Sequence, residues 1–166
     1  MSAVVYTPPT RNLNAPTSRL GIFLAGSIEM GKATNWQEDV VSMLSDLPID
    51  FYNPRRKDWD SSWKQEISNP HFYEQVTWEL DHIESSNVVI FYFQPDTISP
   101  ITLMELGLVA AQNGNVFVCC PEGYFRKGNV DIVCQRYDIP QFSTLDELCQ
   151  TIRDNHYWSL IYGTKD

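Results

Sequence analysis

The amino-acid sequence predicts a doubly wound α/β domain, in which about five parallel strands form a flavodoxin-like three-layer sandwich. Residues 20–25, 88–93 and 116–120 are apolar almost throughout. Continuous apolar runs of this length are typical of strands that are buried on both faces. Segments with apolar residues at helical spacing alternate with these runs, which predicts helices on both faces of a parallel sheet.

The N-terminal stretch differs from the rest of the chain. Residues 1–18 are polar and hold three of the ten prolines, so we expect a flexible arm with little fold content. The remaining residues, 19–166, contain no internal repeat and no linker between domains. We therefore expect them to form a single domain, which is consistent with their length.

The remaining elements follow from apolar spacing and from turn residues. Helices are expected where apolar residues recur every three or four positions, over residues 34–46, 70–84, 100–113 and 144–156. A short strand at residues 49–52 ends at Asn53 and Pro54, a pair that favours a turn. Strands and helices thus alternate along the chain.

Ligands of open parallel sheets bind beyond the carboxyl ends of the strands. The segments that follow the predicted strands are residues 26–34, 53–63, 94–102 and 121–129. We expect substrate contacts in these segments.

Charge and composition exclude several functions. The formal net charge is −9, which disfavours polymeric nucleic acid and anionic membranes as partners but does not exclude an uncharged nucleoside. No apolar run approaches the ~20 residues that span a bilayer, and no secretory signal is expected. The four cysteines show neither metal-ligand nor redox spacing. We expect reduced thiols in a cytoplasmic protein.

Glu105 is the most informative single residue. It is the only charged residue in the otherwise almost wholly apolar helix over residues 100–113, which Ser99 is expected to cap and Pro100 to begin. One interpretation is a buried glutamate that is satisfied by backbone donors. The other is a carboxylate at the ligand edge of the sheet, kept ionised by hydrogen bonds and by the helix N-terminus.

Glu79 is a second candidate functional carboxylate. In the helix over residues 70–84 it lies on the face defined by Val76, Leu80 and Ile83. A half-exposed or salt-bridged glutamate is one explanation. The other is a second carboxylate in the same cleft as Glu105, and two such groups are the minimum apparatus for glycosidic chemistry.

Several motifs together resemble the nucleoside 2-deoxyribosyltransferases and the related deoxynucleotide N-hydrolases. The residues concerned are the segment 23–28, the helix and strand over 78–91, and the Glu-Leu-Gly tripeptide at 105–107. Segments 53–56 and 126–130 resemble one subgroup of the deoxyribosyltransferases. The resemblance covers roughly residues 20–160, and it rests on the order and spacing of these motifs.

The resemblance implies a role for each matching residue. Glu105 falls on the family's nucleophile. Glu79 stands where the family usually has an aspartate that contacts the nucleobase. Asn129 falls on a position that reaches the sugar from a neighbouring subunit. Phe23 stands where many relatives have a tyrosine whose hydroxyl orients the nucleophile.

The loops contain the other implied contacts. Gly26, Ser27 and Asn53 match loop motifs that contact substrate. Ser99 stands where transferases have an acid and nucleotide hydrolases have a phosphate-binding serine. Asp96, three residues earlier, can replace that acid as a partner for the base.

Two further features have competing explanations. Trp59 is a candidate platform for stacking on the base, although tryptophans in small domains more often belong to cores and interfaces. Arg55 and Arg56 can bind a phosphate, although a solvated pair is the commoner case. The aromatic segment 156–162 suits a docked tail or a subunit contact.

The implied reaction is transfer of 2-deoxyribose between nucleobases through a covalent ester on Glu105, with retention of configuration and without a metal or organic cofactor. Its partners are a deoxynucleoside and a free nucleobase. A hydrolase of deoxynucleosides or deoxynucleotides uses the same residues, and a non-catalytic nucleotide-sensing module is a third possibility. A homo-oligomer with shared active sites is expected.

Overall fold

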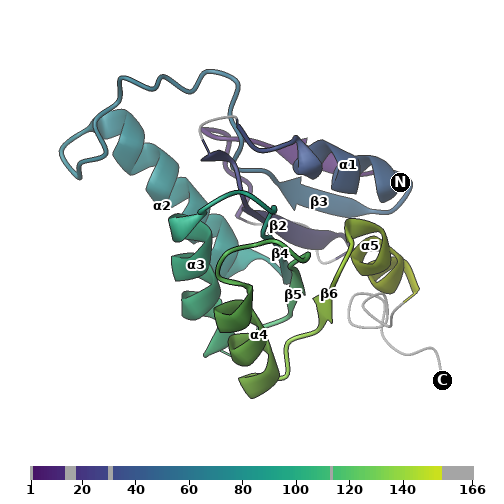
Figure 1. Cartoon of the computed structure of the whole chain (residues 1–166). Coiled ribbons are helices and arrows are strands. Elements are labelled where there is room, and N and C mark those ends of the chain that lie inside the picture. Colours follow the sequence, from purple (N-terminus) through teal and green to yellow (C-terminus); the bar gives the residue numbers. More distant parts are fainter. Residues whose placement is uncertain (1, 14–17, 30–31, 113, 155–166) are drawn as a thin grey trace.

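The structure is a computed structural model that describes residues 2–13, 18–29, 32–112 and 114–154. It is a three-layer α/β fold with one parallel sheet between two layers of helices (Figure 1). The predicted fold class is confirmed, although the sheet has six strands among the described residues, where about five were expected. None of the described helices has both the length and the apolarity required to cross a bilayer.

The strands of the sheet, in chain order, are β1 (Val4–Tyr6), β2 (Leu20–Gly26), β3 (Ile49–Tyr52), β4 (Val88–Tyr92), β5 (Val116–Cys119) and β6 (Gln141–Phe142). The helices are α1 (Trp36–Met43), α2 (Pro70–Ser85), α3 (Pro100–Ala110), α4 (Lys127–Arg136) and α5 (Leu145–Asp154). Each predicted strand and helix is present, with ends that differ by a few residues.

The strand order is β1-β3-β2-β4-β5-β6, and all neighbouring strands are parallel. From β2 the chain moves to β3 on one side, and it later returns to β4 on the other side. Gly26 at the end of β2 pairs with Tyr92 at the end of β4. The carboxyl ends of these two strands therefore meet at the topological switch point, where open parallel sheets bind ligands.

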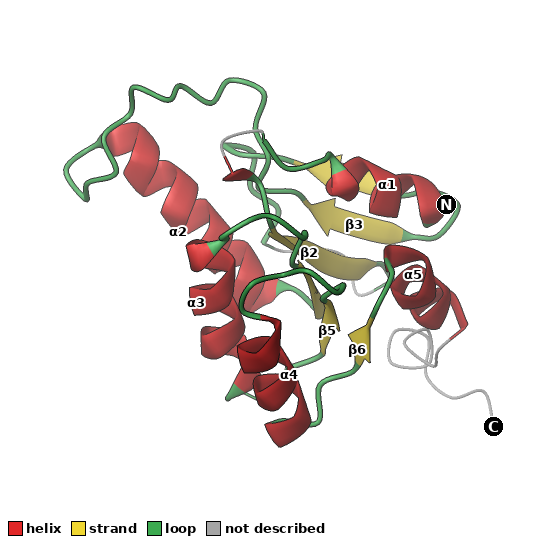
Figure 2. Cartoon of the chain, viewed as in Figure 1, coloured by secondary structure: helices red, strands yellow, loops and turns green. Residues whose placement is uncertain are grey.

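Alternate residues of β2 face the two helical layers. Phe23 and Ala25 belong to the core shared with α2, α3 and α4. Ile22 and Leu24 belong to the core shared with α1 and α5. Figure 2 shows these helices flanking the sheet on its two faces. Burial on both faces explains why the strand is apolar throughout.

The prediction of an arm with little fold content is wrong for the described part of residues 1–18. Val4–Tyr6 form the edge strand β1, which pairs with residues 50–52. The segment after it is held on α2, since Trp78 Nε1 donates to the carbonyl oxygen of Thr10 at 2.8 Å and Arg11 pairs with Asp81. Backbone pairing and these long-range contacts organise a segment whose composition is polar.

Helix α4 and strand β6 were not predicted. The segment that contains Asn129 was described above only as following a predicted strand, and residues 127–130 are the first turn of α4, so Asn129 lies on a helix. The aromatic segment 156–162 lies outside the described residues.

Candidate active site

The end of β2 is packed so closely that only glycine fits. A Cβ atom on Gly26 would lie 2.5 Å from the Trp36 ring and 2.6 Å from the carbonyl oxygen of Tyr92. The indole nitrogen of Trp36 also donates to the carbonyl oxygen of Ser27 at 3.0 Å. These contacts fix the loop that leaves β2 against the end of β4.

Three buried hydroxyl groups join this loop to the start of α3. Ser27 Oγ lies 2.6 Å from Ser99 Oγ and 2.8 Å from Thr97 Oγ1, and the last two are 3.0 Å apart. Ser99 was expected to cap α3 with its side chain, but it has left-handed backbone (φ 49°) and its side chain makes no cap bond. Its hydroxyl is used in the cluster instead.

Glu105 lies in the second turn of α3 and is 6% exposed. Burial, together with the charge of Glu79, raises its pKa well above the usual value. The described residues donate no hydrogen bond to its carboxylate. The expectation that hydrogen bonds keep Glu105 ionised therefore stays a prediction.

Glu79 faces the same region from α2. Burial raises the pKa of Glu79 to about 7, and a hydrogen bond from Gln75 opposes that rise. Gln75 Nε2 donates to Glu79 Oε1 at 2.7 Å and to the carbonyl oxygen of Pro54 at 3.0 Å. Gln75 thus holds the carboxylate of Glu79 and ties it to the loop after β3.

The structure brings the two predicted carboxylates together. They come from adjacent helices on one face of the sheet, and they are close enough for the charge of Glu79 to raise the pKa of Glu105. Two carboxyl groups that interact in this way resist double ionisation, so the pair holds a proton to higher pH than either group would alone. One group that donates a proton beside one that accepts it is the arrangement required for acid and nucleophilic roles.

The loop between β3 and α2 is built from arginine and aromatic contacts. Asn53 Oδ1 accepts from the backbone amide of Arg55 at 3.0 Å, which forms a local turn. The Arg55 guanidinium donates to the carbonyl oxygens of Ala33 and Thr34, both at 2.9 Å. Arg55 therefore joins this loop to the segment before α1.

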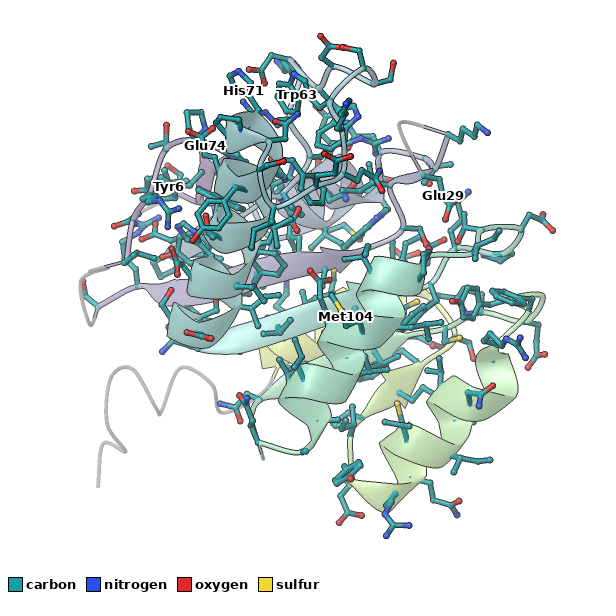
Figure 3. All side chains as sticks on the ribbon, turned by 90° about the vertical axis from the view of Figure 1, so that its left-hand side faces the viewer. Tyr6, Glu29, Trp63, His71, Glu74 and Met104 are labelled. Atoms are coloured by element: carbon teal, nitrogen blue, oxygen red, sulfur yellow. The ribbon has the colours of Figure 1, made fainter. Side chains whose placement is uncertain are left out.

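Trp59 belongs to an aromatic cluster in the same loop. Its ring packs edge-on against Trp63 at 5.2 Å between centroids, and Trp63 stacks on His71 at 4.9 Å. Figure 3 shows Trp63 and His71 side by side near the start of α2. The Trp59 Nε1 group is buried and has no hydrogen-bond partner among the described residues. The role of Trp59 at the base stays a prediction.

The other predicted residues have separate positions. Phe23 is fully buried against Trp78, with 6.2 Å between ring centroids, which is a packing position beneath α2. Asp96 is exposed in a turn with φ 65°. Asn129 is exposed on the first turn of α4. The described residues contain no group of histidine, cysteine, aspartate and glutamate side chains suited to hold a metal ion.

Sequence reasoning missed three residues of this region. The contact of Gln75 with Glu79 could have been predicted, because Gln75 precedes Glu79 by one helical turn and side chains at this spacing are neighbours. The contacts of Thr97 and Glu29 could not have been predicted from local sequence, because their partners lie about 70 residues away in the chain.

Comparison with known proteins found a family match and a solved structure of similar fold. A family model described as "Nucleoside 2-deoxyribosyltransferase like" matches residues 19–124, well over half of the chain. The crystal structure of a conserved protein from Enterococcus faecalis V583 superposes with a TM-score of 0.58 at 14% sequence identity, covering 81% of this chain and 98% of that one. At that identity the likeness shows the fold alone. No curated protein matches the chain significantly.

Proposed function

Because the chain belongs to the nucleoside 2-deoxyribosyltransferase-like family, we propose that it transfers the 2-deoxyribosyl group from one nucleobase to another. The family supports glycosyl transfer or hydrolysis on nucleosides. The observation that carries the proposal is the pair formed by half-buried Glu79 and buried Glu105, which lie on adjacent helices beside the switch point of the sheet.

In the first step, the Glu105 carboxylate attacks C1′ of the deoxynucleoside. The bond from C1′ to the base nitrogen breaks, and its electron pair stays on the base. Glu79 donates its proton to the base, and a deoxyribosyl ester of Glu105 forms. A pKa of about 7 suits this donor, because the group is half protonated at neutral pH.

In the second step, a nitrogen of the incoming base attacks C1′ from the side that the first base left. The ester bond breaks, its electron pair returns to the Glu105 carboxylate, and the proton of the incoming base passes to Glu79. Two displacements at the same carbon retain the configuration. These steps use only side chains of this chain and the two substrates.

The mechanism requires the retained proton to lie on Glu79 while Glu105 is ionised. In the single chain, burial favours the neutral form of Glu105. Hydrogen-bond donors from the bound sugar or from a second subunit would stabilise the carboxylate and move the proton to Glu79. The proposal therefore includes a site that is completed by its ligand and its assembly.

The outer face of α3 supports assembly into a homo-oligomer. Ile101, Met104 and Leu108 are each about half exposed, and they border Glu105 on the helix. Figure 3 shows Met104 on the outward side of α3, with α4 beside it. On α4, Ile132 is exposed one turn after Asn129. A contiguous apolar face of this kind marks an interaction site, and we infer that a second copy covers it.

The direct test is to incubate the protein with thymidine and adenine and to separate the products. Transferase activity yields deoxyadenosine and thymine in equal amounts. Release of thymine and free deoxyribose without deoxyadenosine would instead assign a hydrolase. Saturable binding of the nucleoside without either product would assign a sensing module.

A further inference from the structure

Residues 10–12 form a strap that is hydrogen-bonded to helix α2 at both of its ends. Trp78 Nε1 donates to the carbonyl oxygen of Thr10 at 2.8 Å. The backbone amide of Asn12 donates to His82 Nε2 at 3.3 Å. Trp78 and His82 are one helical turn apart and fully buried, and their ring centroids are 4.1 Å apart. The strap is therefore fastened to two buried aromatic side chains that pack on each other.

The two hydrogen bonds of the His82 ring define its protonation state. Its Nδ1 atom lies 2.7 Å from the carbonyl oxygen of Trp78. A carbonyl oxygen can only accept, so Nδ1 carries a proton and donates. Nε2 accepts from the Asn12 amide, which requires a nitrogen without a proton. The ring is therefore neutral while the strap is in place, and a second proton would set two donors against each other.

The surroundings of His82 do not favour a cationic ring. The charged and titratable side chains around the ring and its contact with Asn12 come from the strap, the residue before β2, strand β3 and α2, and they are Arg11, Arg19, Asp50, Tyr52 and Asp81. Asp81 is paired with Arg11. Asp50 is paired with Arg19 at 2.6 Å. Burial lowers the pKa of His82 below its usual value of 6.5, the bond to Trp78 opposes that change, and the charge of Arg11 adds to it.

We propose that His82 is a pH-sensitive latch, which holds the strap on α2 while its ring is neutral and releases the strap when its ring is protonated. The released ring takes up a proton more readily than the docked ring. The contribution of the latch is therefore fully present above about pH 6.5, and it is lost as pH falls towards the lower pKa of the docked ring. Because release takes up one proton, its equilibrium constant should rise by up to ~10-fold per pH unit.

Release of the strap affects the helix that carries the proposed acid. Trp78 directly precedes Glu79 and packs against Phe23 of β2, with 6.2 Å between ring centroids. Without the strap, its indole nitrogen loses the carbonyl oxygen of Thr10 as acceptor. Acidification therefore removes contacts from the part of α2 next to Glu79. The latch itself involves no substrate, so the inference does not depend on the proposed reaction.

Two measurements on the whole chain test the latch without substrate. Nitrogen NMR of the imidazole rings at about pH 8 should show His82 with its proton on Nδ1 and none on Nε2. Hydrogen exchange is followed at the Asn12 amide and the Trp78 indole N–H, as protection factors that correct for the intrinsic rate at each pH. Both factors should fall together by up to ~10-fold per pH unit below about pH 6.5. The amides of β2 should keep their protection, because the core stays folded.

Variants separate the latch from a general effect of acid. In His82→Gln the protection of the Trp78 indole N–H should not depend on pH. Because His82 is buried, Asn12→Pro provides a second variant, which removes the bonded amide without changing the core, and it should give the same result. Asn12→Ala keeps that amide, and His71→Gln makes the histidine change at an exposed position of α2. Both are controls and should keep the wild-type dependence.

Three results would overturn the latch. The first is a proton on Nε2 of His82 at about pH 8, and the second is protection of both N–H groups that stays level on acidification. The third is a pH dependence that persists in His82→Gln or in Asn12→Pro. A parallel loss of protection in β2 would also count against the latch, since it would indicate global unfolding instead of release of the strap.

Discussion

The side-chain amide of Gln75 donates a 2.7 Å hydrogen bond to Glu79 Oε1, one turn further along α2. The same amide nitrogen donates to the carbonyl oxygen of Pro54, so the glutamine cannot turn away without losing a buried bond. Because the bond stabilises the ionised form, it lowers the pKa of Glu79 against the effect of burial. Gln75 is thus a positioning residue for the proposed acid.

Replacing Gln75 should therefore change the pH profile. In Gln75→Leu the donor is lost, so the pKa of Glu79 should rise above 7, and the alkaline limb of kcat/KM should move upward by about one pH unit. Glu74→Gln, at the adjacent and more exposed position, serves as the control and should leave the limb in place. A profile that is lower but not displaced would reduce Gln75 to a packing residue.

The alkaline limb of the kcat/KM profile should reflect the ionisation of Glu79. The group acts as an acid only when protonated, so kcat/KM should fall on the alkaline side as Glu79 loses its proton, with an inflection near its pKa of about 7. Glu79→Gln should lower the rate by ~10²-fold or more and abolish the limb. A near-normal rate with an unchanged profile would assign Glu79 a purely structural role.

Loss of Glu105 should remove the chemistry and leave the fold. Glu105→Ala and Glu105→Gln should lower turnover by ~10³-fold or more, because both changes remove the carboxylate that forms the ester. Mass spectrometry of the wild type, quenched with acid during turnover, should show a deoxyribosyl adduct on the peptide that contains Glu105. Substantial transferase activity in Glu105→Ala would refute the covalent mechanism.

The same buried carboxyl group should cost stability as pH rises. The folded-state pKa of Glu105 is raised above its unfolded value, so its contribution is fully present below about pH 4.5 and is lost as pH rises towards the folded pKa. Glu105→Gln should therefore raise Tm by about 5 °C at pH 8 and by much less at pH 4. Glu84→Gln should change neither value. A Tm difference that is independent of pH would argue against the raised pKa.

The sequence predicts the sheet more completely than the site, for physical reasons that particular residues illustrate. Strand β2 is buried on both faces, so its apolar run identifies it without any tertiary information. Strand β1 is three residues long in a polar stretch, and only its pairing with β3 makes it a strand. Helix α4 begins at Lys127 and Gly128 and exposes Ile132, so its pattern is weakly amphipathic.

In the candidate site, too, some features follow from local sequence and others depend on tertiary contacts. Helical periodicity is a local property, and it placed Glu79 and Glu105 on inward-facing positions of their helices. The ionisation of the pair depends on burial and on the distance between two helices, which local pattern does not contain. The contacts of Gln75 with Pro54 and of Glu29 with Ser99 depend on loops returning to the sheet edge. Residues that hold or modify the carboxylates are therefore visible only in the folded chain.

Assembly on the outer face of α3 gives the last prediction. Ile101 and Met104 are more than half exposed beside Glu105, and burying them against a second copy would also exclude the water that competes for the glycosyl ester. Light scattering at micromolar concentration should give at least twice the chain mass of 19.1 kDa. Met104→Lys should give the monomer mass and little turnover. Ile67→Lys is the matched control, because Ile67 is exposed in the loop before α2.

Mixing two inactive variants tests whether the sites are shared. If Asn129 of one subunit reaches the sugar in its partner's site, Asn129→Ala should assemble normally and lose most of its activity. In a mixed dimer of Asn129→Ala and Glu105→Ala, one site carries both changes and the other carries neither. Random exchange should therefore restore about a quarter of wild-type activity, since half the dimers are mixed and each has one intact site of two. A fully active monomer, or mixing that restores nothing, would contradict shared sites and leave Asn129 with a local role on α4.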